Sequence, residues 1–459
     1  MKTKTTDIYS LVEKYNIPGP RYTSYPTALH FKEAENNHRL KHYFETRSKI
    51  PRSISLYFHI PFCFSLCWYC GCTKIITKDR EKGEVYLDYI KKEAELVRRT
   101  LHPESPVKQI HFGGGTPTFL TPVQLQRLGQ IIQDQFFVHP EVEFSVEIDP
   151  RTCSEEHIIA LKKIGVNRAS LGVQDTNEEV QQAIHRIQPF TQTENVTKNL
   201  RKHSIENINL DLIYGLPRQN RNTFRQSLDQ VLMLQPNRLA IYSYAHVPSL
   251  MPTQKLLKEE EFPSAGEKIS MLVDTVERLP DEGYRFIGMD HFARENDELS
   301  RALDDGSLQR NFQGYSTLAE LEMIALGMSG ISMGNDFYYQ NTKNLAEYYD
   351  WLDSDRLPVK KIVSLTKEDL LRRNIIMKIM CRGEINYKDF FNETGINFEN
   401  TFVKELTYIT ELEEDELLIH DQTGFSVTDT GRLFLRNVAM IFDGYREQSN
   451  PSKSYSKTV

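Results

Sequence analysis

Four cysteines gathered within ten residues are the part of this sequence best suited to chemistry. They are Cys63, Cys67, Cys70 and Cys72, in a chain of 459 residues with six cysteines. A disulfide framework would distribute its cysteines to close loops, whereas a tight group predicts a metal centre. The other two, Cys153 and Cys381, are isolated in the sequence, and we expect both to be small buried side chains.

The spacing Cys-x3-Cys-x2-Cys suits an iron–sulfur cluster. A structural cluster takes four thiolates, and a catalytic metal site keeps one position free for its reactant. Cys63, Cys67 and Cys70 would therefore ligate a cluster that leaves one iron open. The alternative is a structural zinc site with Cys72 as fourth ligand. The single residue between Cys70 and Cys72 counts against zinc, whose cysteine pairs are usually spaced by two to four residues.

The elements that must position this loop are predicted as alternating strands and helices. Residues with β-rich composition cover 53–60, 109–112, 143–148, 168–173, 208–214 and 239–244. Residues with helical spacing cover 86–101, 122–135, 155–164, 194–203, 221–234 and 266–282. The alternation predicts an α/β fold with a parallel sheet and helices outside it. Six units favour a partial (β/α)6 barrel, although periodicity alone also permits a doubly wound sheet.

Glycines and polar residues mark the ends of the predicted strands. The second strand ends in Gly-Gly-Gly-Thr-Pro-Thr from residue 113, where glycines allow close approach of a ligand to backbone amides. A triple glycine alone is more often a turn. Barrels of parallel strands build their active sites at the carboxyl ends, so we expect the polar residues there to line a site, although any one of them could face solvent. They are Glu147, Asp149, Gln174, Asp175, Asp211 and Tyr244.

Four segments are predicted along the chain. Three prolines make residues 18–27 extended and helix-poor, within an N-terminal arm over the active site. Charged helices followed by two short strand-like runs predict a small, mostly helical, winged-helix-like C-terminal domain. The polar tail is expected to be frayed. The segments are 1–50 for the arm, 51–350 for the barrel, 360–447 for the C-terminal domain and 448–459 for the tail.

Composition and charge exclude several classes of function. The net charge of −7 opposes nucleic acid as the main partner, because phosphate binding needs a basic field. No apolar run approaches the roughly 20 residues of a membrane span, and the N-terminal MKTKTTDIYS lacks an apolar signal segment. We therefore expect a cytoplasmic globular protein.

Combinations of these motifs resemble a known superfamily. The cysteine loop with Tyr69 before its third cysteine, the glycine segment and Glu147 together resemble the radical S-adenosylmethionine (SAM) enzymes. Within that superfamily, longer motifs over nearly the whole chain resemble the oxygen-independent coproporphyrinogen III oxidases. They include Pro-Arg-Tyr-Thr-Ser-Tyr-Pro-Thr from residue 20, His-Ile-Pro-Phe-Cys from 59, Asp-Leu-Ile-Tyr-Gly-Leu-Pro from 211, Phe-Ile-Gly-Met-Asp-His-Phe-Ala-Arg from 286 and Arg-Asn-Phe-Gln-Gly-Tyr from 310.

This resemblance implies a reaction and its cofactors. A [4Fe–4S] cluster would cleave SAM to a 5′-deoxyadenosyl radical, which takes hydrogen from a propionate β-carbon of coproporphyrinogen III. Carbon dioxide leaves, an acceptor removes one electron, and two such events give the vinyl groups of protoporphyrinogen IX. The family also implies a second SAM and an electron donor such as a flavodoxin or ferredoxin. We expect a monomer.

The resemblance also implies roles for individual residues. Cys63, Cys67 and Cys70 would hold the cluster, and Cys72 would serve catalysis without ligating it. The first SAM would contact Tyr57, Gly114, Glu147 and Ile331. The second SAM would contact Tyr69, Gly115, Thr116, Gln174, Arg186, Asp211 and Ala245. Each could instead belong to a turn, a cap or a solvated surface, and Ala245 and Ile331 could be core residues.

The substrate's four carboxylates predict an arginine-lined pocket, because arginine binds carboxylates bidentately. The candidates in the matching motifs are Arg21, Arg294 and Arg310, each of which could instead form a surface ion pair. Two departures from the family pattern occur, at Phe64 and over residues 322–325. The remaining alternatives are a radical SAM haem chaperone, an anaerobic haem-degrading methyltransferase and a non-catalytic zinc protein that binds nucleic acid.

Overall fold

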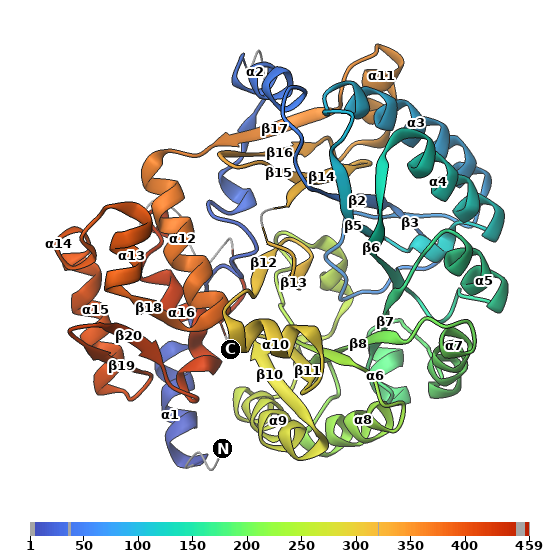
Figure 1. The fold of residues 1–459 in the computed structure, drawn as a ribbon. Helices are drawn as coiled ribbons and strands as arrows, with labels where there is room; N and C mark the ends of the chain where they lie inside the picture. Colours follow the sequence, from blue (N-terminus) through green and yellow to red (C-terminus); the bar gives the residue numbers. More distant parts are fainter. Residues whose placement is uncertain (1–4, 35–37, 320, 447–454, 459) are drawn as a thin grey trace.

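One large, curved sheet forms the centre of the protein (Figure 1). The computed structural model describes residues 5–34, 38–319, 321–446 and 455–458. The sheet has 13 strands in the order β1-β17-β16-β15-β14-β2-β5-β6-β7-β8-β9-β11-β10. All pairings from β14 to β9 are parallel, and the pairings outside this range are antiparallel.

The predicted (β/α)6 unit is confirmed. Its strands are β2 (Ile54–Ile60), β5 (Pro106–Gly114), β6 (Phe137–Ile148), β7 (Arg168–Gln174), β8 (Asn207–Tyr214) and β9 (Arg238–Ser243). Its helices are α3 (Glu81–Arg99), α4 (Pro122–Gln135), α5 (Glu155–Lys163), α6 (Glu178–Ala183), α7 (Phe190–Lys202), α8 (Arg221–Met233) and α9 (Ala265–Arg278). These six strands lie side by side in chain order, whereas strand order reverses in a doubly wound sheet. The long helices lie on the outer, convex side (Figure 1).

Alternation along the strands separates the core from the barrel lumen. Leu56, Ile110 and Val146 are fully buried in the main hydrophobic core. Because successive side chains of a strand point to opposite faces, their neighbours Tyr57, His111 and Glu147 face the other side of the sheet. The polar residues at the strand ends are thereby directed into the lumen.

Further strands widen the sheet beyond the six units. On the β2 side lie β14 (Glu322–Leu326), β15 (Ile331–Met333), β16 (Phe337–Asn341), β17 (Val359–Ser364) and β1 (Lys32–Glu33), and on the β9 side lie β11 (His291–Arg294) and β10 (Tyr284–Gly288). A separate hairpin pairs β12 (Gln309–Asn311) with β13 (Gly314–Ser316). Helices α10 (Glu298–Asp305) and α11 (Leu345–Asp353) complete this part. The sheet thus includes β1 from the predicted arm and β17 from beyond residue 350. The predicted boundaries of the four chain segments stay predictions.

The C-terminal region packs as helices around a small three-stranded sheet. Its elements are α12 (Lys367–Arg382), β18 (Glu384–Asn386), α13 (Tyr387–Thr394), α14 (Phe398–Thr401), α15 (Val403–Glu414), β19 (Leu418–Asp421), β20 (Gly424–Val427) and α16 (Leu435–Met440). The expected hairpin is β19–β20, and β18 pairs with β20 as a third strand. Among the described residues, no helix is long and apolar enough to cross a membrane.

The two ends of the chain meet beside the C-terminal region. Helices α1 (Thr5–Tyr15) and α2 (His38–Arg47) flank the helix-poor segment 18–27. The expectation of a frayed tail is wrong for residues 455–458, because Pro18 pairs with Lys457 in a β-bridge and the Thr458 amide donates to the Ile17 carbonyl at 2.9 Å. Arg436 fastens this pairing, since its guanidinium donates to the carbonyls of Pro20 and Lys457, each at 3.0 Å. Residues 447–454 and 459 of the predicted tail lie outside the described residues.

Candidate active site

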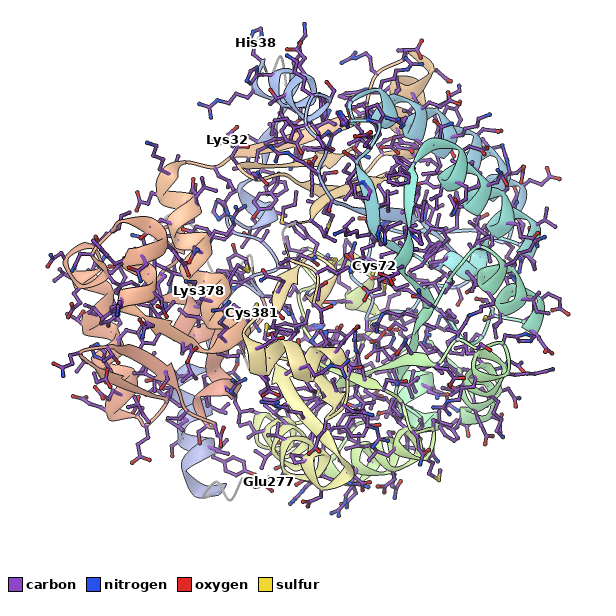
Figure 2. The ribbon with its side chains drawn as sticks, in the orientation of Figure 1. Lys32, His38, Cys72, Glu277, Lys378 and Cys381 are labelled. Carbon is purple, nitrogen blue, oxygen red and sulfur yellow. The ribbon has the colours of Figure 1, made fainter. Side chains whose placement is uncertain are left out.

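The cysteine loop lies between two short parallel strands, β3 (Phe62–Cys63) and β4 (Ile75–Ile76). A turn distant in sequence holds it from the side: the Trp68 amide donates to the Ile184 carbonyl at 3.1 Å, and the Trp68 and His185 rings stack at 5.2 Å. Figure 2 shows Cys72 within the curve of the sheet, away from Cys381 on α12. The loop is thus placed beside the carboxyl ends of the strands.

The thiols of this loop are all free, and polar groups surround them. The Cys63 sulfur lies 3.3 Å from the Thr116 hydroxyl, and the Cys67 sulfur accepts from Arg151 at 3.5 Å and Arg186 at 3.6 Å. No three His, Cys, Asp or Glu side chains of the described residues are close enough to hold a single metal ion. Three free thiols on one loop suit a cluster, whose iron atoms are held one thiolate each.

The triple glycine is required by close packing at the end of β5. The φ of Gly114 is +114°, a conformation that favours glycine. A Cβ at position 113 would lie 2.9 Å from Glu147 Oε1, and one at position 115 would lie 2.7 Å from the Pro61 backbone. The Gly114 amide donates to Glu147 Oε2 at 3.2 Å. Only glycines bring this backbone so close to the carboxylate and to the cysteine loop.

Glu147 presents a carboxylate to the space beside the glycines. Its side chain is 46 % exposed at the carboxyl end of β6, and His111 Nε2 lies 3.2 Å from its Oε1. The Tyr57 ring stacks on His111 with centroids 5.7 Å apart. Glu147 can accept from an ammonium group, and Tyr57 forms a wall of the same space. His111 was not predicted, although its position before the glycines in a strand was a usable signal.

Arg186 joins the cysteine loop to the ends of β6 and β7. It donates to Asp149 Oδ2 at 3.0 Å and to the Gly172 carbonyl at 2.7 Å. Although burial opposes the charge, the nearby Tyr69 and Asp149 raise the pKa of Arg186. Burial likewise opposes ionisation of Asp149, but Arg186 and Arg151 lower its pKa to about 2. The Arg186 Nε is buried and has no partner among the described residues, as expected if a ligand supplies one.

Gln174 and Asp211 lie on neighbouring strands next to Arg186. Gln174 has a φ of +69° at a bulge between β7 and β8. Asp211 accepts from Ser170 at 3.0 Å and from Asn209 at 2.7 Å, and burial raises its pKa to about 7. Ser170 and Asn209 were not predicted, because nothing local in the sequence shows that they share the lumen with Asp211.

Tyr69 and Ala245 are brought together by a residue that the sequence did not indicate. The Gln254 amide group donates to the Tyr69 carbonyl at 3.1 Å and to the Ala245 carbonyl at 3.0 Å. Thr116 is buried beside Cys63. Asp175 and Tyr244, by contrast, serve packing: Asp175 is fully buried and accepts from Gln219 and Ser227, and Tyr244 packs in an apolar cluster.

The two departures from the family pattern have structural explanations. Residues 322–325 belong to β14, where Glu322 is buried and forms an ion pair with Arg47. Ala325 of β14 lies opposite Tyr57, and Ile331 opens the next strand, β15. Ile331 is therefore two strands from Tyr57, and its contact with SAM stays a prediction. Phe64 packs on Phe119, with ring centroids 4.6 Å apart.

The three candidate arginines occupy different surroundings. Arg21 forms an ion pair with Asp290 and donates to the Ser243 carbonyl at the end of β9. Arg310 is buried over the Tyr315 ring. Arg294 donates to the carbonyls of Pro236 and Glu282 and stacks on Tyr284. Its guanidinium is thus bonded to backbone carbonyls at the rim of the fold, and its role as a substrate residue stays a prediction.

Known proteins share this fold over almost the whole chain. Residues 57–231 match the model of the Radical SAM superfamily, and residues 365–434 match that of the HemN C-terminal domain. A solved structure, described as coproporphyrinogen III oxidase (HemN) from Escherichia coli and a radical SAM enzyme, superposes with a TM-score of 0.89. It is 37% identical, with 94% of this chain and 100% of that chain covered. The fold, the cysteine loop and these matches define a radical SAM enzyme.

Curated relatives narrow the class further. Oxygen-independent coproporphyrinogen III oxidases from Pseudomonas aeruginosa and Escherichia coli K12 are 40% and 39% identical to this chain, over 98% of it and 98% of their own length. The enzyme of that name from Helicobacter pylori 26695 is 42% identical over 97% of this chain and 98% of its own length. The chain belongs to the oxygen-independent coproporphyrinogen III oxidase family.

Proposed function

We propose that this chain converts two propionate groups of coproporphyrinogen III to vinyl groups without oxygen, giving protoporphyrinogen IX. The observation that carries the proposal is the joint placement of three free thiols, Glu147 and the buried Arg186 at the carboxyl ends of the strands. Family membership over 97–98% of the chain supports the same reaction.

The cysteine loop fits a [4Fe–4S] cluster, with Cys63, Cys67 and Cys70 as its ligands. When bound and reduced, the cluster supplies the electron that cleaves SAM to methionine and a 5′-deoxyadenosyl radical. Arg186 and Arg151 donate hydrogen bonds to the Cys67 sulfur and so hold this side chain in position. Cys72 lies at the exposed side of the loop and is proposed to assist turnover rather than ligate iron.

The first SAM is proposed to lie against β2, β5 and β6, with Ile331 as a further contact. Glu147 would accept from its ammonium group, and the Gly114 amide holds Glu147 in position at 3.2 Å. Tyr57, stacked on His111, would exclude water from one side. The conformation of Gly114 allows the backbone to approach the ligand closely.

A second SAM is proposed at the other side of the lumen. Its contacts would be Tyr69, Gly115, Thr116, Gln174, Arg186, Asp211 and Ala245. Arg186 has a buried Nε that lacks a partner among the described residues, and Asp211 has a carboxyl that can donate or accept near neutral pH. Gln254 sets the separation of Tyr69 and Ala245.

The remaining assignments follow from the family and are proposals for this chain. An electron donor such as a flavodoxin or ferredoxin would approach the cysteine loop from its exposed end at Cys72, and the enzyme would act as a cytoplasmic monomer. Cys72 favours the oxidase over a haem chaperone, whose sequences usually lack it.

Anaerobic turnover tests the proposed function. The reconstituted protein, SAM, a low-potential reductant and an electron acceptor are mixed with coproporphyrinogen III, and the products are oxidised to porphyrins and separated. We expect protoporphyrin with two fewer carboxylates and stoichiometric 5′-deoxyadenosine. Cleavage of SAM with no loss of carbon dioxide from the substrate would contradict the assignment.

A further inference from the structure

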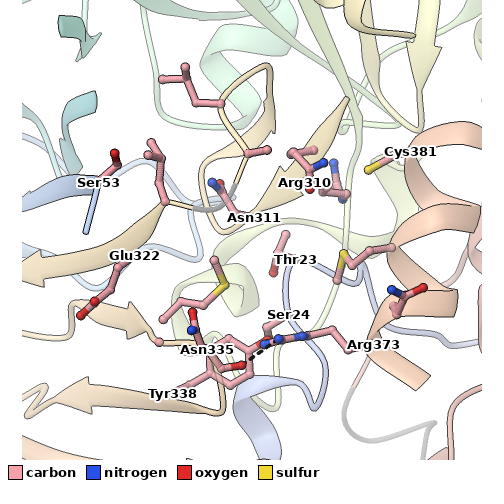
Figure 3. A pocket seen from close by; sticks show the side chains of 18 of the residues that line it. Thr23, Ser24, Ser53, Arg310, Asn311, Glu322, Asn335, Tyr338, Arg373 and Cys381 are labelled. Carbon is pink, nitrogen blue, oxygen red and sulfur yellow. Dashed lines mark hydrogen bonds between the residues drawn. The ribbon is translucent and has the colours of Figure 1, made fainter. Parts of the chain in front are cut away.

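A large cavity lies outside the cluster and SAM contacts. Its volume is about 1020 Å³, and it is an open cavity bordered by the N-terminal arm, β12, the β15–β16 turn and α12 (Figure 3). The barrel lumen that contains Glu147 and Asp211 is a separate space of about 180 Å³. Ligand pockets in proteins typically occupy roughly 300–1,000 Å³, so the larger cavity has room for a macrocycle.

Cations dominate the wall of this cavity. Glu322 is the one carboxylate among its described lining residues, and it is already bonded to Arg47 at 2.8 Å. Lys378 is paired with Glu393 at 2.6 Å. The cationic lining residues are Arg52, Lys108, Arg310, Arg373, Lys378 and Arg382. The cavity therefore favours an anionic ligand with several charges.

Arg310 is the strongest sign that a ligand belongs here. Its side chain is on a residue only 8% exposed, and its Nε and Nη1 have no hydrogen-bond partner among the described residues. Its Nη2 donates to the Arg21 carbonyl at 3.4 Å, and its guanidinium lies 4.7 Å from the centre of the Tyr315 ring. A buried guanidinium without a counter-ion is costly. A carboxylate in the cavity would supply the missing counter-ion and accept a charge-assisted hydrogen bond from the guanidinium.

Helix α12 offers both a second cation and an acceptor. Arg373 is held by bonds to the Asn335 carbonyl at 2.8 Å and the Tyr338 hydroxyl at 3.4 Å. Asn374 Oδ1 is buried and has no partner among the described residues. An amide oxygen in this position can accept from a pyrrole N–H. Figure 3 shows Arg310, Thr23 and Arg373, from three separate segments, around one opening.

The cavity adjoins the proposed radical site through two elements. Arg310 and Tyr315 lie directly opposite each other in the hairpin, and Tyr315 lines the lumen together with Glu147. Strand β15 begins at Ile331, a proposed SAM contact, and ends at Met333 in the cavity wall. The two spaces therefore adjoin at the β12–β13 hairpin, which contributes Arg310 to one and Tyr315 to the other. The apolar part of the wall is formed by Leu308, Leu318, Met333, Leu370 and Met377.

We propose that this cavity docks the tetracarboxylate macrocycle, with Arg310 and Arg373 binding propionates and Asn374 accepting from a pyrrole. The inference rests on the proposed function and extends it, because it assigns substrate recognition to α12 of the C-terminal region as well as to the barrel. The apolar residues pack against the ring, and the cations bind its edge.

Binding of coproporphyrin III, the fluorescent oxidised macrocycle with the same four propionates, tests the proposal. Fluorescence titration of the reconstituted enzyme is compared among the wild type, Arg310→Gln, Arg373→Ala and Arg127→Ala. Arg127 lies on the outer helix α4 in ion pairs with Glu84 and Asp88, and it controls for the loss of one positive charge. We expect each cavity variant to weaken binding about tenfold or more, because a buried charge pair is lost, and Arg127→Ala to bind like the wild type.

Two further measurements distinguish failure of the docking site from failure of the proposed function: binding of an uncharged ester and decarboxylation by the wild type. Coproporphyrin III tetramethyl ester lacks the charges, so its affinity should be low and equal in all four proteins. Circular dichroism verifies folding, and Arg373→Ala decides the matter if Arg310→Gln does not fold. Wild-type affinity of both cavity variants for coproporphyrin III would overturn the docking site while leaving decarboxylation by the wild type intact. Failure of the wild type to decarboxylate would instead overturn the function.

Discussion

Arg21 of the N-terminal arm forms an ion pair with Asp290, its Nη1 lying 2.5 Å from the carboxylate Oδ2 in the turn between β10 and β11. The Asp290 charge raises the pKa of Arg21. The same guanidinium donates to the Ser243 carbonyl at 3.2 Å and lies over the Tyr242 ring. The arm is therefore anchored across the carboxyl end of β9, and Arg21 is neutralised by the protein itself.

This pair should couple the arm to the barrel energetically. In a double-mutant cycle of Arg21→Ala and Asp290→Ala, we expect a coupling of about 1–2 kcal/mol in the free energy of unfolding, measured with urea. The value lies above that of surface pairs because both partners are partly enclosed. The exposed pair Lys92–Asp353 serves as the control cycle and should show little coupling. Coupling at Arg21–Asp290 no larger than in the control cycle would show that this pair stabilises the arm no more than an exposed surface pair does.

The three proposed cluster ligands should be individually indispensable. Replacing Cys63, Cys67 or Cys70 with Ala should abolish the brown chromophore after anaerobic reconstitution and stop SAM cleavage, because each iron needs its own thiolate. Absorbance, iron and sulfide content, and methionine release measure the effect. Cys153→Ala removes a thiol outside the loop and should behave like the wild type. A brown, SAM-cleaving variant at any of the three positions would remove that residue from the ligand set.

Cys72 should behave differently from its neighbours. Its thiol, as a hydrogen-bond donor, lowers the pKa of Cys70. We expect Cys72→Ala to retain the cluster's absorbance and to lose about a hundredfold or more in the rate of vinyl product formation, the usual scale for removing one positioned proton-transfer group. Spectra and product analysis on the same preparation check both statements. A colourless Cys72→Ala protein would show that Cys72 ligates the metal centre.

Asp211 should make stability depend on pH. Burial raises its pKa to about 7, whereas an aspartate in an unfolded chain ionises near pH 4. Between these values the native state holds a proton that the unfolded state has released, so the wild type loses unfolding free energy as pH rises through about 7. Asp211→Asn lacks this ionisation.

The comparison is made by urea unfolding at about pH 5 and about pH 8. From about pH 5 to about pH 8, the free energy of unfolding of Asp211→Asn should rise relative to that of the wild type by on the order of 2 kcal/mol. Asp134→Asn, on the exposed face of α4, is the control for the loss of one carboxylate. A difference between Asp211→Asn and the wild type that does not change with pH would refute the raised pKa.

The sequence predicted the barrel well, because each strand is a short apolar run and each helix repeats its apolar residues at helical spacing. Residues 122–135, for example, are bounded by a capping box at Thr121 and match α4 without error. Strands β14 to β17 were not predicted individually. Their order depends on pairing with β2, a partner more than 250 residues away, and Glu322 interrupts their apolar character.

The candidate site was predictable where a motif fixes chemistry, as for Cys63, Glu147 and the glycines. Supporting residues such as Gln254 were missed because their role is to join two backbone carbonyls that are remote in sequence. Arg294 lies in a matching motif, yet backbone carbonyls at the rim take up its hydrogen bonds. A motif thus predicts the region of the site in which a residue lies, whereas the hydrogen-bond partners of its side chain depend on the folded structure.

The contact between Trp68 and Ile184 bears on how the enzyme is assembled. A ribosome must add more than one hundred residues after the cysteines before the turn that supports their loop exists. Until then the loop lacks the Arg186 bond to Cys67 and its stacking on His185. In a nascent chain that ends before residue 184, the cysteine loop would lack the contacts that hold its conformation. We therefore expect the metal centre to assemble after the barrel has been translated.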